Sequence, residues 1–213
     1  APEAVAENRR RFARALGAQP VFLDQVHGVR VVRLAAAADA ARAEPTPPRA
    51  DASLTTAPGI ACTVLVADCL PVLLAAPAGR GVAALHAGWR GLAAGVIETT
   101  LAALCDAAGC APGDVSAWLG ACIGPRRFEV GADVLEAFGA PARRFSPRPG
   151  VPGKWFADLP GLARDRLRAA GLSAVAGGAW CTVEEGSRFF SFRRDGVTGR
   201  MAAAIWIRPR GAG

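Results

Sequence analysis

Two apolar runs near the middle of the chain constrain its fold most. The run TVLVA, residues 63–67, lies just before Cys69, and the run VAALH, residues 82–86, ends at His86. Short apolar runs separated by a turn rich in glycine and proline are typical of strands buried inside a sheet. Because functional side chains gather where rigid strands end, we expect Cys69 and His86 to belong to a functional site.

The rest of the chain predicts helices and strands in an irregular order. We expect helices over residues 3–16, 91–108, 129–139 and 157–171. We expect further strands over residues 21–25, 29–34, 50–56, 115–120, 187–196 and 201–207, and loops over residues 35–50 and 141–154. Neighbouring strands without a helix between them favour an α+β fold, a layered mixed β-sheet with packed helices. With no linker and no repeat, we expect a single domain over residues 1–213.

Composition and charge exclude several classes of protein. Of the 213 residues 52% are hydrophobic, which is enough for a sizeable core. No apolar run reaches the roughly 18 residues of a membrane helix, and no secretory signal opens the chain. We therefore expect a soluble, cytoplasmic protein with no membrane partner. The net charge of +7 comes from scattered arginines without interleaved aromatic residues, so we expect no nucleic-acid partner, while small anionic substrates remain compatible.

The cysteines do not indicate a disulfide framework. A chain of this length without a secretory signal is expected to keep its thiols reduced. The six cysteines are Cys62, Cys69, Cys105, Cys110, Cys122 and Cys181. No two of them are spaced as CxxC, which disfavours a zinc site built from four cysteines. Cys105 and Cys110, in or after an alanine-rich helix, are expected to pack as small hydrophobic residues.

The two histidines of the chain are candidates for a metal site together with one cysteine. His27 in QVHG and His86 in LHAGWRG are each followed closely by a glycine, which lets the backbone approach a bound group. His27, Cys69 and His86 would supply two imidazoles and one thiolate, the ligand set of a catalytic zinc site with one open position. Their spacing matches no short metal motif, so a hydrogen-bonded core histidine and an inert buried cysteine remain alternatives at this point.

The ordered motifs of the chain add a family resemblance. LDQVHG, ADCLPVLL, LHAGWRGLAAGV, GACIGPRRFEVG, WFADL and RFFSFRRDGVTGRMAAAIWI extend from about Asn8 to Ile207. They resemble the family variously named laccase-domain proteins, multicopper polyphenol oxidases, peptidoglycan editing factors and purine nucleoside phosphorylases. The resemblance implies that His27, Cys69 and His86 bind zinc in the active site. It also implies a layered α+β fold similar to the catalytic domain of the necrotizing-factor toxins, a cysteine-hydrolase-like fold.

Two features depart from the pattern of the family. The usual N-terminal strands before ENRR are absent from this chain. A cysteine that many members carry after IGP is replaced here by Arg126 or Arg127. Any role of that cysteine is therefore in doubt for this chain, whereas the three implied zinc ligands are intact.

The names of the family disagree about its activity. A multicopper oxidase needs several copper centres ligated mainly by imidazoles, and two histidines are too few for them. A copper-dependent, laccase-like polyphenol oxidase, with copper as a substitute for zinc, is therefore the weaker alternative. The resemblance implies a zinc-dependent purine nucleoside phosphorylase with adenosine deaminase activity, acting on adenosine, inosine, guanosine and methylthioadenosine. Its partners would be purine nucleosides and phosphate, and zinc would act as a Lewis acid.

Four further residues are candidates for substrate binding. Arg90 is the first candidate for binding phosphate and Arg193 the second, since a buried anion needs a cation; a solvated surface arginine is the alternative for each. Asp68 can orient an imidazole or assist proton transfer, or simply cap the end of a strand. Trp89 and Phe190 can each stack on a purine, although packing in the core is the favoured role for Phe190.

Two rival functions stay open. The first is a metal-free cysteine hydrolase with Cys69 as nucleophile and His86 as base, which the likeness to the toxins suggests. The second is a link to peptidoglycan precursors, either as an editing amidase that removes a wrongly incorporated serine or as a non-enzymatic partner of cell-division proteins. Sensitivity to a chelator and dependence on His27 would separate zinc chemistry from the cysteine hydrolase.

Overall fold

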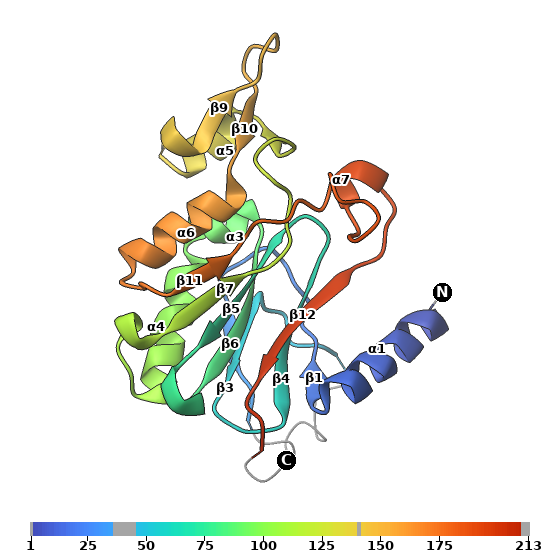
Figure 1. The fold of residues 1–213 in the computed structure, drawn as a ribbon, viewed down its shortest axis with the longest axis vertical. Helices are drawn as coiled ribbons and strands as arrows, with labels where there is room; N and C mark the ends of the chain where they lie inside the picture. The colour runs from blue at the N-terminus through green and yellow to red at the C-terminus, as the bar shows by residue number, and fades with distance from the viewer. Residues whose placement is uncertain (1, 36–45, 140–141, 210–213) are drawn as a thin grey trace.

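The fold was analysed in a computed structural model, which describes residues 2–35, 46–139 and 142–209. Its main body is a sheet of six strands in the order β11-β7-β5-β6-β3-β2 (Figure 1). These strands are β2 Val31–Arg33, β3 Ala52–Thr55, β5 Leu70–Ala75, β6 Val82–Ala87, β7 Ser116–Leu119 and β11 Val175–Gly177. β2 runs parallel to β3 and β11 to β7, whereas the inner strands pair antiparallel, so the sheet is mixed.

A second sheet packs on one face of the first. Its three strands are β1 Gln19–Val21, β4 Ile60–Val66 and β12 Met201–Trp206, in the order β1-β4-β12. β4 and β12 contact β6, β3 and β5 of the larger sheet. A smaller sheet is formed by β8 Glu129–Val130, β9 Phe145–Pro147 and β10 Trp155–Ala157.

Helices cover the other face of the large sheet. The described helices are α1 Pro2–Leu16, α3 Trp89–Ala94, α4 Val96–Ala108, α5 Ala132–Ala137, α6 Leu159–Ala169 and α7 Phe192–Asp195. α4 packs on β6 and β3, and α6 packs on α4. The layers of helices, mixed sheet and second sheet confirm the α+β class. None of the described helices combines the length and the apolar character that crossing a membrane requires.

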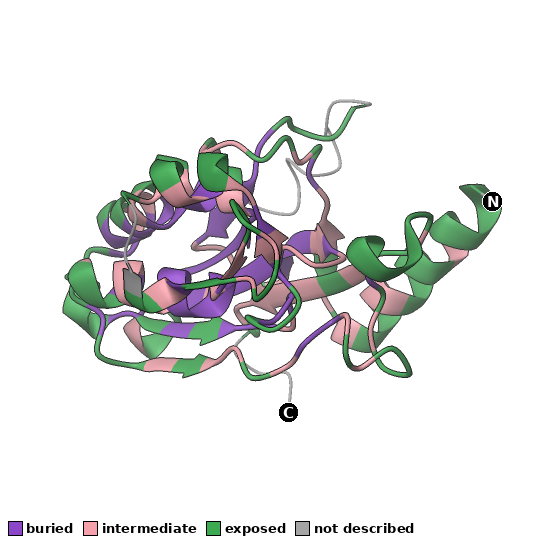
Figure 2. Cartoon of the chain, turned by 90° about the horizontal axis from the view of Figure 1, so that it is seen from above, coloured by how far each residue is buried: buried purple, intermediate pink, exposed green. Residues whose placement is uncertain are grey.

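The buried residues explain why the central strands form. All six residues of β6 are buried, because helices cover one face of its sheet and β4 with β12 covers the other. The main core lies between the large sheet and the helices, and a smaller core around Val64 and Val82 lies between the two sheets. Figure 2 shows the buried segments gathered in the middle of the body. By contrast, α1 has no buried residue and extends from the body.

Several predicted elements differ from the observed ones. The predicted helix over residues 91–108 begins at Trp89 and is broken at Gly95, whose φ of 97° ends α3 and precedes α4. The predicted strand over 187–196 is wrong, because Ser191 caps the N-terminus of α7 there. The predicted helix over 129–139 begins with β8 and is helical only in α5.

Smaller differences concern strand ends and loops. The strand predicted over 21–25 is β1, which ends at Val21, and the strand predicted over 29–34 is limited to β2. The loop predicted over 141–154 contains β9, which pairs with β10 because Phe145 is buried between neighbours. The loop predicted over 35–50 falls largely on residues 36–45, which lie outside the described residues.

Candidate metal centre

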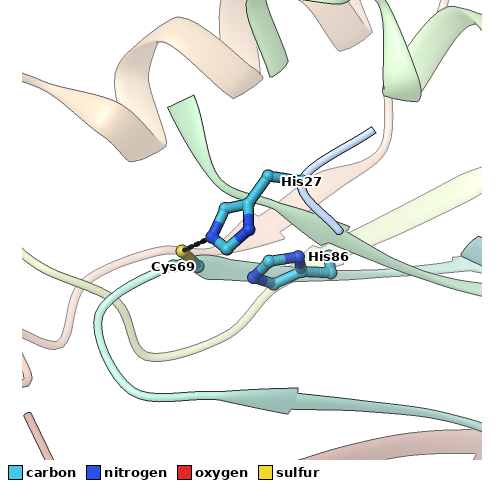
Figure 3. Close-up of side chains that lie close together, drawn as sticks. All are labelled: His27, Cys69 and His86. Carbon is cyan, nitrogen blue, oxygen red and sulfur yellow. Dashed lines mark hydrogen bonds between the residues drawn. The ribbon is translucent and has the colours of Figure 1, made fainter. Parts of the chain in front are cut away.

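The fold brings His27, Cys69 and His86 together (Figure 3). His27 lies between β1 and β2, Cys69 lies in the turn from β4 to β5, and His86 lies in β6. β5 and β6 are paired so that Leu70 faces Ala87, which places the residue before β5 beside the end of β6. The ligand atoms of the three side chains lie within 4.8 Å of one another.

The distance between two of these donor atoms suits a small tetrahedral ion. The Sγ atom of Cys69 lies 3.6 Å from Nε2 of His27. Zinc bonds of about 2.3 Å to sulfur and about 2.0–2.1 Å to nitrogen, at a tetrahedral angle, would separate these two atoms by about 3.6 Å. Two imidazoles and one thiolate are also the mixed nitrogen and sulfur donors that zinc accepts. The three residues therefore fit a zinc ion with one position left open.

Two glycines make room for this arrangement. A Cβ atom on Gly88 would lie 2.6 Å from Cδ2 of His27 and 3.1 Å from Sγ of Cys69. A Cβ atom on Gly91 would lie 2.8 Å from the backbone oxygen of Gly28. Both distances are too short for a side chain, so the glycines of the HAGWRG segment allow the start of α3 to pack against the turn that carries His27.

The backbone is strained on both sides of the centre. His27 has a φ of 62° and Asp68, which precedes Cys69, has a φ of 99°. Non-glycine residues rarely adopt this left-handed region, and such conformations persist where the surrounding contacts hold them. Hydrogen bonds to the carboxylate of Asp51 hold the turn that contains His27. Hydrogen bonds to its own carboxylate hold Asp68.

Asp51 is a site residue that was not predicted from the sequence. Its carboxylate is fully buried and accepts a hydrogen bond from Nδ1 of His86 at 2.9 Å. It also accepts three backbone N–H groups, from Val26 at 3.1 Å, His27 at 2.8 Å and Gly28 at 2.7 Å. A signal was present in the sequence, because an aspartate at the start of a buried strand needs partners for its charge.

The hydrogen bonds of Asp51 fix the chemistry of His86. Burial alone would raise the pKa of Asp51, but the bonds from His86 and from the three backbone amides hold this pKa below its usual value. An ionised carboxylate can only accept, so Nδ1 of His86 is the donor, and Nε2 is the nitrogen that can bind a metal once it carries no proton.

Electrostatics favour a thiolate at Cys69. Burial opposes ionisation of the thiol, but the neighbouring imidazoles of His27 and His86 lower the pKa of Cys69 to about 6. Burial likewise opposes the charged form of His86, while Asp51 and Cys69 raise the pKa of His86 to about 9. A thiolate is the form of cysteine that binds metals and attacks carbon, so Cys69 is suited to either role.

The three residues lie in a cleft of about 560 Å³, a volume typical of sites for small molecules. Trp89 and Arg90, at the start of α3, belong to its lining, as do Phe192 and Arg193 of α7. Other lining residues are Leu23, Gln25, Leu65, Val66, Ala67, Asp68, Ile123, Phe128, Leu159 and Arg200.

Arg90 and Arg193, the two candidates for binding phosphate, differ in the contacts of their guanidinium groups. The guanidinium of Arg90 lies 4.3 Å from the centre of the Trp89 ring, and the described residues offer it no carboxylate partner. That of Arg193 donates to the backbone oxygen of Glu129 at 3.0 Å and lies 5.6 Å from the Phe128 ring. Arg90 is therefore the freer cation in the cleft.

Asp68 does not hydrogen-bond an imidazole, and Phe190 does not lie in the core. The carboxylate of Asp68 accepts from Oγ1 of Thr182 and from the backbone N–H of Arg193, each at 2.6 Å. The carboxylate that orients an imidazole is that of Asp51 instead. Phe190 is 50% exposed, so its predicted place in the core is wrong. Phe192, which the sequence analysis did not single out, lines the cleft.

The remaining cysteines and Arg126 lie outside this lining. All six cysteines are free thiols, and four of them, Cys62, Cys105, Cys122 and Cys181, are buried. Arg126 forms two hydrogen bonds with the carboxylate of Glu184, at 3.1 Å and 2.8 Å. Arg126, the residue after IGP, thus forms an ion pair with Glu184 at the surface.

Comparisons with known proteins agree with the motifs. Residues 1–208 match the family described as multi-copper polyphenol oxidoreductase laccase. The chain is 48% identical over 210 residues to the purine nucleoside phosphorylase PA4543 of Pseudomonas aeruginosa, covering 97% of this chain and 82% of that protein. It is 47% identical to the purine nucleoside phosphorylase YfiH of Escherichia coli, with the same coverage of 97% and 82%.

Solved structures share the fold. A crystal structure of the Neisseria meningitidis protein NMB0706 matches with a TM-score of 0.88 and 45% identity, over 98% of this chain and 83% of that one. YlmD from Geobacillus stearothermophilus matches with a TM-score of 0.83 and 31% identity, over 95% of this chain and 79% of that one. The resemblance noted in the sequence is confirmed: the chain belongs to the multi-copper polyphenol oxidoreductase laccase family.

Proposed function

We propose that this protein is a zinc-dependent purine nucleoside phosphorylase that also deaminates adenosine. The observation that carries the proposal is the cluster of His27, Cys69 and His86 in a cleft large enough for a nucleoside. Relatives that are nearly half identical bear the name purine nucleoside phosphorylase. The proposed substrates are adenosine, inosine, guanosine and methylthioadenosine, together with phosphate.

Each residue of the cleft has a task in this proposal. His27, Cys69 and His86 hold the zinc ion, which when bound supplies a Lewis acid to polarise an oxygen or nitrogen of the substrate. Asp51 keeps His86 in the tautomer that binds through Nε2. In phosphorolysis a phosphate oxygen bonds to C1′ of the ribose while the bond from C1′ to the base breaks. Arg90 is the cation that holds the phosphate for this attack, because its guanidinium lies over the Trp89 ring, whereas those of Arg193 and Arg200, which also line the cleft, donate to backbone oxygens.

The experiment that tests this proposal combines metal analysis with product analysis. Protein purified without added metal is analysed by mass spectrometry for bound metal, and adenosine turnover is followed with and without phosphate. We expect about one zinc per chain, adenine when phosphate is present, and inosine from deamination. Cys69→Ala should lose both the zinc and the products. A metal-free wild type that converts no purine nucleoside would contradict the proposal.

A metal-free cysteine hydrolase is the second candidate, and one observation favours it. Cys69, His86 and Asp51 form a series of nucleophile, base and orienting carboxylate, with 2.9 Å between His86 and Asp51. Such an enzyme would fit the proposed likeness to the necrotizing-factor toxins and the hydrolysis of an amide in a peptidoglycan precursor. It would keep its activity in the presence of a chelator and would not need His27, whereas the zinc enzyme would lose activity in both cases.

Copper-dependent oxidation of phenols is the weakest candidate. The family description names several coppers, but the chain contains two histidines in all. Among the described residues, one cluster of side chains is arranged to hold a metal ion. One copper ion in place of zinc would have no further copper centre here to share the electrons of oxygen reduction.

A further inference from the structure

The cleft contains one large aromatic ring that is exposed without being part of the core. Phe192 is 58% exposed and lines the cleft of the candidate metal centre. The other exposed large apolar side chains among the described residues are Val5, Val26, Trp118, Phe190 and Val197, and none of these lines that cleft. Single exposed apolar side chains are common on protein surfaces, so it is the place of Phe192 in the cleft lining, and not its exposure alone, that distinguishes it.

The backbone under this ring is held firmly although the ring is exposed. Phe192 begins α7, a helix of four residues that is too short to be stable by itself. The buried Ser191 caps it by accepting the N–H of Arg194 at 3.1 Å. The guanidinium of Arg194 donates to the backbone oxygens of Thr182 at 2.8 Å and Phe189 at 3.0 Å. These bonds fix α7 in place without burying Phe192.

Asp68 links this helix to the metal centre. One oxygen of its carboxylate accepts the backbone N–H of Arg193, the residue after Phe192, at 2.6 Å. The other oxygen accepts the hydroxyl of Thr182 at 2.6 Å. Because Asp68 directly precedes Cys69 and has a φ of 99°, the position of α7 is tied to that of the proposed zinc ligand.

Trp89 of α3 and Phe192 of α7 both line the cleft, but their rings are not equally free to stack on a purine base. The guanidinium of Arg90 lies over the Trp89 ring at 4.3 Å and covers one of its faces. For the Phe192 ring, no aromatic or cationic partner is found among the described residues. A phenyl ring with a free face suits the flat π-surface of a purine, and stacking is the contact such a ring can offer.

We propose that Phe192 is the residue that stacks on the purine base, and that Asp68 and Arg194 position it relative to the metal centre. This inference rests on the proposed function, since it specifies how the same cleft recognises the base. It makes Phe192 a specificity residue of the cleft. Trp89 serves mainly to carry Arg90, the proposed phosphate ligand.

The test compares Phe192→Ala with Phe190→Ala as a matched control. Phe190 is two residues away and 50% exposed, but it packs beside Gly199 and does not line the cleft. We expect Phe192→Ala to raise the KM for inosine about tenfold or more, the loss that removal of one stacking contact causes. The KM for phosphate and the zinc content should not change. Phe192→Tyr, which keeps the ring, should restore the KM, and Phe190→Ala should resemble the wild type.

Binding of free hypoxanthine, measured by calorimetry on the metal-loaded protein, separates this inference from the proposed function. Hypoxanthine that binds the wild type and binds Phe192→Ala about tenfold more weakly would support stacking, even if the wild type does not phosphorolyse inosine. Equal KM values for inosine and equal hypoxanthine affinities in wild type and Phe192→Ala would overturn the inference. In that case phosphorolysis by the wild type would leave the proposed function intact.

Discussion

The carboxylate of Asp51 hydrogen-bonds to both proposed histidine ligands: it accepts a hydrogen bond from Nδ1 of His86 at 2.9 Å and one from the backbone N–H of His27 at 2.8 Å. One buried side chain thus sets the orientation of one imidazole and the path of the turn that carries the other. Hydrogen bonds within the protein thus hold both histidines of the proposed metal centre in place, which lowers the cost of ordering them when a metal binds.

Asp51→Asn should weaken zinc binding about 10- to 100-fold. The amide keeps the shape of the side chain but loses the charge that holds the proton on Nδ1 of His86, and its NH₂ group cannot accept the backbone N–H groups that Asp51 accepts. The dissociation constant can be measured by competition with a zinc-binding dye. Asp24→Asn, at an exposed position, is the control and should bind zinc as the wild type does. Equal affinities for both variants would remove Asp51 from the centre.

Gly88→Ala should lose zinc although the change adds only a methyl group. Its Cβ atom would lie 2.6 Å from Cδ2 of His27 and 3.1 Å from Sγ of Cys69, so these two proposed ligands must shift from their present positions. We expect at least a tenfold fall in zinc affinity, measured by the same competition. Gly113→Ala adds the same methyl group at an ordinary distance of 3.6 Å from the nearest backbone oxygen and should leave the affinity unchanged. A Gly88→Ala protein that holds zinc normally would show that the close contact is relieved in another way.

Arg90→Ala should separate the two proposed reactions. Phosphorolysis needs a bound phosphate, and losing its charged hydrogen bonds should raise the KM for phosphate about tenfold or more. Deamination of adenosine needs no phosphate and should continue at a similar rate. Arg11→Ala removes an exposed arginine of α1 and is the charge-matched control. If both reactions fell equally in Arg90→Ala, this arginine would serve the structure of the cleft and not the phosphate.

The ion pair of Asp165 and Arg144 predicts a pH dependence of stability. Two hydrogen bonds of 2.8 Å from the Arg144 guanidinium hold the pKa of Asp165 below its usual value of about 3.9. A lowered pKa in the folded state stabilises the protein above that usual value, and this contribution is lost as the pH falls through the folded pKa. Asp165→Asn should therefore reduce the free energy of unfolding by about 1 kcal/mol at pH 7 and by less near pH 3. Urea unfolding at both pH values checks this, with the exposed Asp106→Asn as control.

The class of fold was predicted from the pattern of elements, and the three residues that meet at the centre were predicted through the family resemblance, because their spacing alone left other roles open. The apolar runs before Cys69 and up to His86 form β4 and β6, because burial on both faces selects continuous apolar strands. An aspartate at the start of a buried strand indicates that Asp51 needs partners, but its four hydrogen-bond donors come from residues that are distant in the sequence, so its link to His27 and His86 was missed.

The segment around Phe192 was mispredicted for a related reason. Its phenylalanines have a high strand propensity, and its arginines suit the exposed face of a strand, so the sequence favoured a strand. The segment instead bonds to residues from elsewhere in the chain: the backbone N–H of Arg193 donates to the carboxylate of Asp68, and the guanidinium of Arg194 donates to the backbone oxygen of Thr182. Tertiary contacts of this kind override local propensity, and they made Phe192 a residue of the cleft that the sequence did not reveal.

The central claim is that His27, Cys69 and His86 hold one zinc ion that the enzyme needs. The most direct measurement is the zinc content and inosine phosphorolysis of the wild type and of His27→Ala, Cys69→Ala and His86→Ala, each before and after treatment with a chelator and re-addition of zinc. We predict about one zinc per wild-type chain, activity lost with the chelator and regained with zinc, and neither zinc nor activity in the three variants. Activity that survives the chelator, or that survives in His27→Ala while Cys69→Ala is inactive, would contradict the claim and favour a cysteine hydrolase.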